Sequence, residues 1–260
     1  MSTPDSSSKD VKNEVPNDLL NPIPKDHVNE ASLKLFPDRR PGSSSVIKNS
    51  YLYRLFARDS YARLKCEKSV KEIVESSPMV KLMMAALNSS GCPVDISRHI
   101  ACEPCNRGVT GGYDPTLNQI VICYNQCSSK SMMDGVLGHE LLHAWDYCRA
   151  NLDFDNVRHV ACTEIRAANL FHCSIMSGFI AGSVSLTNLS KAHSRCVKQK
   201  AVASILAVRP QMDPREAWKV VDSVFDKCYN DLEPIGRRVR RNSRDRERAY
   251  RERYFYGYDD

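Results

Sequence analysis

Alternating apolar and polar stretches divide the chain into a central body and two polar ends. In the body, apolar residues recur three or four positions apart, which is the spacing of one helix face. Pro78 and the Asp213–Pro214 pair mark helix starts, because proline fits the first turn of a helix. These signals predict helices over residues 51–74, 79–87, 131–149, 157–170, 189–208 and 215–229.

The two ends lack this pattern. Residues 1–48 are rich in Ser, Pro, Asp and Lys and contain few large apolar side chains. Such a segment buries too little surface to offset the entropy lost on ordering, so we expect a disordered N-terminal tail. Residues 237–260 are rich in arginine and are expected to form a disordered C-terminal tail. This leaves 49–236 as a single folded domain, for which the pattern predicts an α+β fold.

The predicted helix over 131–149 carries the candidate chemistry. It contains His139-Glu-Leu-Leu-His143, and residues four apart share a helix face, so both imidazoles can bind one metal ion. Two neutral imidazoles suit zinc, and a zinc site with an open position acidifies a bound water. Glu140 can then act as the general base in peptide-bond hydrolysis. The alternative is an amphipathic helix that carries two histidines without a metal.

Three residues compete to be the third ligand. Asp146 shares the face of His143, but at a rise of about 1.5 Å per residue its short side chain lies too far along the helix. We expect it to orient His143 from outside the ligand set. His159 and Glu164 lie on the next helix, five residues apart, and so face different directions. Small residues beside Glu164 favour its burial, which zinc would compensate. We expect Glu164, with His159 and Asp146 as alternatives.

Residues 92–127 have the pattern of β structure. A strand is indicated around 94–100, and the stretch from Gln119 to Tyr124 is a strong strand candidate. A strand directly before a zinc-binding helix often forms the edge to which a peptide substrate adds as an extra strand. Glycines 108, 111 and 112 would let the substrate backbone come close, although a plain hairpin turn explains them equally well.

Eleven cysteines form a high count for 260 residues, and all fall within the predicted domain. Disulfides are one interpretation, although the sequence shows no export signal. A structural zinc site is a second, because Cys102-x2-Cys105 and Cys123-x3-Cys127 are spaced much as in a zinc ribbon. Free buried thiols are the third. We expect disulfides, with at least one cysteine unpaired because the count is odd.

Charge and hydropathy limit where the protein can reside. The net charge of +6 is uneven, and much of the excess lies in the last two dozen residues. The longest weakly polar run, 175–186, is about a dozen residues and too short to span a bilayer. The N-terminus has neither the apolar core of a secretory signal nor the acid-poor composition of a matrix presequence. We therefore expect a soluble or peripherally bound protein.

Two motifs together resemble a known family. Gly138-His-Glu-Leu-Leu-His-Ala-Trp-Asp146 is followed by His159-Val-Ala-Cys-Thr-Glu-Ile-Arg-Ala167, and Cys228-Tyr-Asn-Asp231 lies near the end of the domain. The combination resembles the mitochondrial inner-membrane zinc metalloproteases that process and help to assemble a membrane-sector subunit of ATP synthase. In animals the same family has been described as Ku-binding proteins. The resemblance covers about 52–234 and implies a zincin-like domain, with a small β-sheet and the His-Glu-x-x-His helix. The Glu164-x-x-Ala167 pattern is similar to the third-ligand helix of glutamate-type zincins.

The resemblance also implies a location and a redox environment. It implies residence in the intermembrane space, bound peripherally to the inner membrane, with cysteines oxidised by the relay of that compartment. Such oxidation would explain disulfides without an export signal. Cys92 and Cys102 are separated by nine residues, a spacing of the kind which that relay handles. A chaperone role in assembly that does not need proteolysis is implied as well.

The sequence therefore predicts a Zn²⁺-dependent endopeptidase of the intermembrane space. Its implied partners are the inner membrane and the precursor of a membrane-sector subunit of ATP synthase. A non-catalytic assembly chaperone or scaffold that keeps zinc for folding is the first rival. The arginine-rich end suggests the second, a nuclear metalloprotease associated with nucleic acid, although we do not expect nucleic acid to be a partner.

Overall fold

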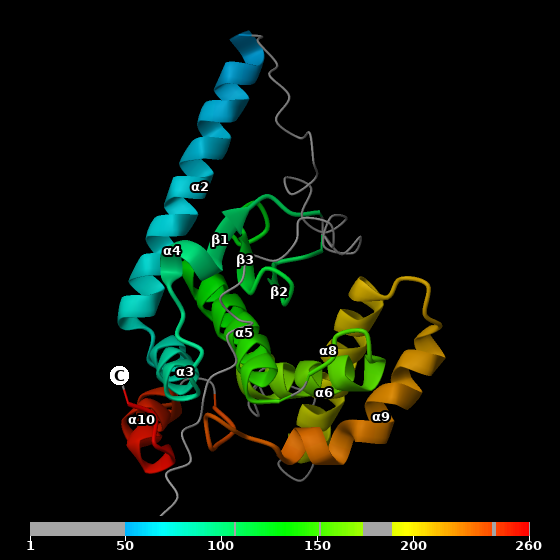
Figure 1. The fold of residues 1–260 in the computed structure, drawn as a ribbon. Coiled ribbons are helices and arrows are strands. Elements are labelled where there is room, and N and C mark those ends of the chain that lie inside the picture. The colour runs from blue at the N-terminus through cyan, green and yellow to red at the C-terminus, as the bar shows by residue number, and fades with distance from the viewer. Residues whose placement is uncertain (1–49, 107, 151, 174–188, 241–242, 260) are drawn as a thin grey trace, which may run out of the picture.

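A computed structural model describes residues 50–106, 108–150, 152–173, 189–240 and 243–259. Figure 1 shows a helical body with one small sheet, from which the first turns of helix α2 (Ser50–Ser76) project. The other α-helices are α3 (Pro78–Ser89), α4 (Ile96–His99), α5 (Lys130–Arg149), α6 (Val157–Ala167), α8 (Leu189–Val208), α9 (Pro214–Asn230) and α10 (Asp245–Glu252). A π-helical segment, η3 (Ala168–His172), continues α6, and a 3₁₀ turn, η5 (Arg253–Tyr256), continues α10. The predicted α+β class is confirmed.

Side-chain caps set the starts of the helices that matter for the site. The side chains of Ser77, Ser129 and Asn156 accept hydrogen bonds from the first-turn backbone N–H groups of α3, α5 and α6. These bonds satisfy donors that have no partner inside the helix. Because Ser129 is the cap, α5 begins at Lys130, one residue before the predicted start.

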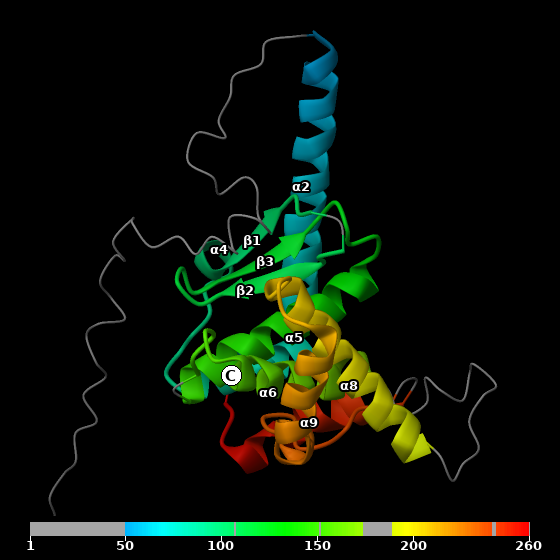
Figure 2. The ribbon, with the colours of Figure 1, turned by 90° about the vertical axis from the view of Figure 1, so that its right-hand side faces the viewer.

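Within the described residues, the sheet has three strands in the order β1-β3-β2. β1 (Ile100–Glu103) pairs parallel with β3 (Gln119–Cys123), and β2 (Gly111–Asp114) pairs with β3 in the antiparallel direction. The strand directly before α5 is therefore central, and the prediction that it forms the edge is wrong. The run of buried β-branched residues in β3 is covered on both faces of the sheet. β2 is the edge strand on the side of α5, as Figure 2 shows.

A second difference lies between residues 94 and 100. The predicted strand there is replaced by the short helix α4, which begins after Asp95 because the Asp95 carboxylate caps the N–H of Ser97 at 2.8 Å. The chain becomes extended only at Ile100, where β1 begins. A local capping bond thus outweighed the apolar spacing.

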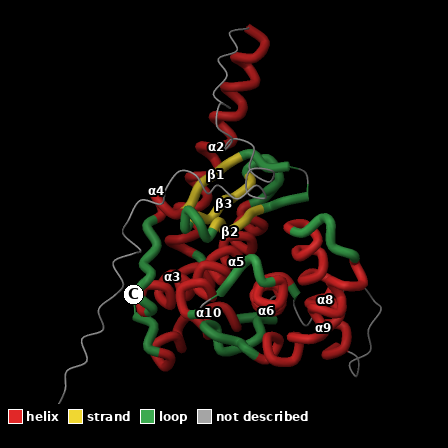
Figure 3. Tube along the Cα trace, turned by 45° about the vertical axis from the view of Figure 1, so that its right-hand side comes forward, coloured by secondary structure: helices red, strands yellow, loops and turns green. Residues whose placement is uncertain are grey.

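Two large hydrophobic clusters form most of the interior on either side of the contact between α5 and α6, which Figure 3 shows at the centre of the body. The first cluster is built mainly on α2, α3, the sheet and α5, and Ala167 of α6, Leu170 of η3 and Ala249 of α10 also contribute to it. The second gathers α6, α8 and α9. We call these two sets of elements the N-terminal group and the C-terminal group. Among the described residues, none of the helices is both long and apolar enough to cross a bilayer.

Five disulfides reinforce these groups, and none joins one group to the other. Cys66–Cys102, Cys92–Cys148 and Cys105–Cys123 lie in the N-terminal group, and Cys162–Cys228 and Cys173–Cys196 belong to the C-terminal group. The remaining cysteine, Cys127, is buried and free. The disulfide prediction is confirmed. The zinc-ribbon interpretation is wrong, because three of the four cysteines that it needs are in disulfides.

The C-terminal segment is ordered over its described residues, contrary to the expectation of a disordered tail over 237–260. Helix α10 packs against α3 and buries Ala249. Asp245 is buried and accepts a hydrogen bond from the Arg240 side chain at 2.8 Å. The buried guanidinium of Arg253 lies 4.0 Å from the ring centroid of Tyr250. The arginines are thus partly neutralised or stacked rather than uniformly solvated. The other predicted tail, 1–48, and the weakly polar run 175–186 lie outside the described residues.

The pairing predicts a definite alkylation pattern. Unreduced, folded protein should take up no thiol reagent, because Cys127 is buried and burial raises its pKa to about 11. Unfolding without reductant should expose one thiol, and unfolding with reductant should expose eleven. Intact mass after alkylation measures each count. More than one thiol in the unfolded, unreduced protein would contradict the pairing.

Candidate metal centre and active site

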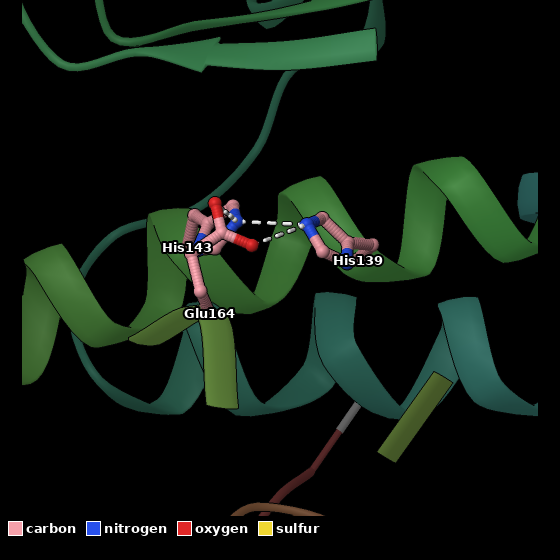
Figure 4. Close-up of side chains that lie close together, drawn as sticks. All are labelled: His139, His143 and Glu164. Carbon is pink, nitrogen blue, oxygen red and sulfur yellow. Dashed lines mark hydrogen bonds and ion pairs between the residues drawn. The ribbon is translucent and has the colours of Figure 1, made fainter. Parts of the chain in front are cut away.

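Helices α5 and α6 bring three potential metal ligands together. His139 and His143 lie on one face of α5, and Glu164 reaches them from α6, as Figure 4 shows. The two Nε2 atoms are 2.9 Å apart, and the Glu164 carboxylate oxygens lie 3.6 Å from His139 and 3.5 Å from His143. Ligands about 2.0–2.1 Å from a tetrahedral zinc ion are about 3.3 Å from one another. The three side chains therefore fit a single ion.

The other two candidates for the third ligand lie outside this group. His159 is exposed, and its Nδ1 accepts a hydrogen bond from the backbone N–H of Asp153 at 3.2 Å. Asp146 is buried one turn beyond His143, where its carboxylate faces Thr163 and Arg166. The five-residue offset from His159 to Glu164 places their side chains on different sides of α6.

The electrostatics of the group favour a cation. Burial, followed by the neighbouring His143, lowers the pKa of His139 well below its usual value, so this imidazole is a neutral donor. Burial alone would lower the pKa of His143, but the adjacent Glu164 carboxylate raises it. The carboxylate that draws a proton onto His143 would equally attract a metal ion. Two nitrogen donors and one anionic oxygen are a donor set typical of catalytic zinc sites.

Glu140 lies where α5 meets the edge strand. Burial raises the pKa of Glu140 to about 7, although the backbone N–H of Tyr113 donates to its carboxylate and opposes this rise. A Cβ atom added at Gly111 would lie 2.4 Å from Val136 Cγ1 and 3.3 Å from Glu140 Oε1. Glycine at this position therefore allows β2 to approach α5 closely. Gly111 therefore has a packing role, and with Gly108 and Gly112 it also lines the cavity over the site, so contact of these glycines with substrate stays a prediction.

A cavity of about 440 Å³ opens over these residues. Its walls include residues 108–115, around β2, and the ligand group on α5 and α6. The opposite wall is formed by one face of α8, where the small side chains of Ala203, Ser204 and Ala207 lie. Lys200 and Arg209 also line this wall. The cavity therefore has an edge strand on one side, a helix of small residues on the other and the candidate ligands between them.

Both histidines are held through their second ring nitrogen. His139 Nδ1 lies 2.8 Å from His172 Nε2, and His143 Nδ1 lies 2.8 Å from Thr163 Oγ1. Sequence reasoning missed both partners. His172 is exposed overall, but its ring packs against His139, and desolvation lowers its pKa to about 4. Neither position carries a sequence signal, because Thr163 and His172 act through other side chains and not through a motif or a periodicity of their own.

The π-helical turn explains how His172 reaches the site. His172 lies eight positions after Glu164, and an α-helix would turn about 80° beyond two full turns over that distance. The wider winding of η3 reduces this offset. Close approach is possible because Gly138 has no side chain: a Cβ atom there would lie 2.2 Å from the Phe171 ring.

Behind the ligands, charged side chains tie α5 and α6 to the segment after α9. Arg166 is buried and pairs with Asp146, with Asp231 at 3.0 Å and with the backbone carbonyl of Glu233. Arg149 pairs with Asp231 at 2.6 Å and with the Glu233 carboxylate at 2.8 Å. Asp231, at the end of the third motif of the sequence, thus bridges two arginines.

Comparison with known proteins gives the class of this chain. The Peptidase M76 family matches residues 64–236. The match covers most of the chain and includes every residue of the ligand group, so the chain belongs to the Peptidase M76 family and is a metallopeptidase.

Several relatives carry one name, mitochondrial inner membrane protease ATP23 homolog. The zebrafish (Danio rerio) protein is 39% identical over 95% of this chain and 94% of its own length. The Xenopus laevis protein is 42% identical over 88% of this chain and 94% of its own length. The human protein is 42% identical over 79% of this chain and 80% of its own length. No solved structure matches.

The competing ligand assignments predict different behaviour of two variants. Glu164→Ala removes an oxygen donor, and its loss of metal affinity should exceed the ~10–100-fold typical of residues that only orient ligands. His159→Ala should bind metal like the wild type, because His159 lies outside the group. Competition with a coloured chelator measures both affinities. The assignment fails if Glu164→Ala retains its metal while His159→Ala loses it.

Proposed function

We propose that this chain is a Zn²⁺-dependent endopeptidase with a zincin-like catalytic domain. His139, His143 and Glu164 are the zinc ligands, and Glu140 is the general base. The observation that carries this proposal is the convergence of two imidazoles and one carboxylate, each within 3.6 Å of its neighbours, at the floor of a cavity. Zinc would supply Lewis-acid activation of a water and of the scissile carbonyl.

The side chains of this protein would provide the remaining steps. Glu140 takes a proton from the attacking water and passes it to the leaving amine nitrogen. A group whose pKa lies near the working pH can both accept and release a proton efficiently. Burial raises the pKa of Glu140 to about 7. The N–H of Tyr113 holds the carboxylate in place and couples the base to the edge strand.

The substrate would bind as an extended strand along β2. This strand is at an edge of the sheet and lines the same cavity as the ligands. Backbone pairing at a sheet edge binds a peptide largely without regard to its side chains, and pockets along the strand then provide selectivity. The wall of small α8 residues leaves space for a side chain of the substrate opposite β2.

We place the activity in the mitochondrial intermembrane space, on the surface of the inner membrane. The names of the relatives support a location at the inner membrane. The five disulfides require an oxidising environment, such as the intermembrane space. The proposed substrate is the precursor of a membrane-sector subunit of ATP synthase, whose assembly the protein would also assist. Assembly without proteolysis is the second candidate function, and the buried, pKa-shifted Glu140 favours the first.

Glu140→Gln separates these two functions. It keeps both imidazoles and Glu164, so zinc should bind with a stoichiometry of about one, while hydrolysis should fall ~10²–10⁴-fold through loss of the base. The assay incubates full-length protein with candidate membrane-subunit precursors, with and without a chelator. A control, Glu216→Gln, changes an exposed glutamate on α9 and should cleave normally. Cleavage by zinc-loaded Glu140→Gln at the wild-type rate would exclude the hydrolytic assignment.

The ordered C-terminal segment supplies a surface suited to the membrane. Phe255 is 87% exposed and Tyr254 is 58% exposed, and the same segment carries the exposed cations Arg248 and Arg251. Aromatic rings favour the lipid–water interface, and arginines are attracted to anionic headgroups. We propose this ordered surface as the point of contact with the membrane.

The variant Arg248→Ser/Arg251→Ser/Phe255→Ser tests this contact. Each arginine contributes about 1 kcal/mol near an anionic surface, so binding should fall at least tenfold. The matched control on α9, Arg215→Ser/Lys219→Ser/Trp218→Ser, removes the same number of charges and rings and should float with anionic liposomes like the wild type. Equal flotation of all three proteins would remove this surface from the proposal.

A further inference from the structure

A continuous chain of buried polar contacts leads away from His143. Its Nδ1 lies 2.8 Å from Thr163 Oγ1, and the same hydroxyl donates to Asp146 Oδ2 at 2.8 Å. Asp146 then pairs through its other oxygen with Arg166, which is held by Asp231. Thr163 therefore stands between a candidate zinc ligand and a buried ion network.

We propose that Thr163 is a positioning residue that sets the tautomer of His143 and thereby aims an unprotonated Nε2 at the metal. The proposal rests on the zinc site of the proposed function, and it adds a group that touches neither metal nor substrate. It assigns to Thr163 the contact with His143 that the sequence had assigned to Asp146.

The direction of each hydrogen bond follows from what each group can donate. A threonine hydroxyl has one hydrogen and spare lone pairs. Since that hydrogen goes to Asp146, the hydroxyl can only accept from His143. His143 Nδ1 must then carry the proton of the neutral ring. Its Nε2, which faces His139 and Glu164, is left with a free lone pair.

The charges around Asp146 keep the Thr163 hydroxyl as the donor to Asp146 and the acceptor from His143. An ionised carboxylate is an acceptor only. Arg166 is 1% exposed and pairs directly with Asp146, and Arg149 Nε lies 3.4 Å from the same carboxylate. Two cations beside one buried carboxylate favour its ionised form. Asp231 in turn holds both arginines, so the segment after α9 contributes to the tautomer of a ligand on α5.

His139 has no comparable constraint. Its Nδ1 faces His172, and an imidazole nitrogen can donate or accept according to its own tautomer. Burial makes the Thr163 contact harder to replace, because Thr163 is 1% exposed and Asp146 is 4% exposed. Bulk water has little access with which to supply the lost hydroxyl. Removal of the hydroxyl should therefore leave His143 Nδ1 without a hydrogen-bond acceptor.

The test compares Thr163→Val with Thr163→Ser in the full chain. Valine keeps the shape and removes the hydroxyl, whereas serine keeps the hydroxyl and removes the methyl group. Zinc affinity, measured by chelator competition, should fall about 10–100-fold in Thr163→Val. In Thr163→Ser it should stay within a few-fold of the wild type. Equal affinity of Thr163→Val and wild type, or an equal loss in both variants, would overturn the proposal.

A second measurement determines the tautomer of His143 directly, in metal-free protein and without an activity assay. In ¹⁵N-histidine-labelled, metal-free protein, at a pH above the titration of the ring, His143 should show a protonated Nδ1 and an unprotonated Nε2. Thr163→Val should shift the ring toward a mixture of the two forms. A wild-type His143 protonated at Nε2 would refute the proposal even if Thr163→Val failed to fold. Wild-type protein that binds zinc and shows the expected tautomer but cleaves nothing would refute only the proposed function.

Discussion

The buried ion pair between Asp146 and Arg166 joins the two helices that carry the candidate ligands. Two imidazoles on α5 and one carboxylate on α6 can meet only if these helices keep a single relative position. Hydrophobic packing brings them together, but such contacts tolerate small sliding movements. A buried charge pair does not, because separation leaves each charge unpaired at a cost of about 3–5 kcal/mol. The ion pair therefore defines the register in which the metal centre forms.

The local geometry of the site could be predicted from sequence, because helix periodicity is a local property. A spacing of four residues placed His139 and His143 on one face, and the angular offset on the next helix separated Glu164 from His159. The order of the strands could not be predicted in the same way. The apolar run from Gln119 to Cys123 fits an edge or a central strand, and its two partners decide which it becomes.

Residues that act through others were the hardest to find. Thr163 and His172 carry no pattern of their own, and their roles depend on the contact between helices and on a π-helical turn. The arginine-rich end misled for a related reason. Its charge density suggested a solvated tail, but Asp245 and the ring of Tyr250 neutralise or stack individual arginines. Amino-acid composition gives only the number of charged residues, whereas the folding of this segment depends on how each charge is paired.

The distribution of the disulfides has a consequence for how the enzyme matures. Each disulfide closes within one group of elements, while the candidate ligands come from both: His139 and His143 from the N-terminal group and Glu164 from the C-terminal group. Oxidation can therefore be completed before any ion is acquired. The ion is then a reversible cross-link between two covalently stapled parts. The metal centre would thus be filled or emptied without breaking a sulfur–sulfur bond, while the Asp146–Arg166 pair keeps the two helices in register.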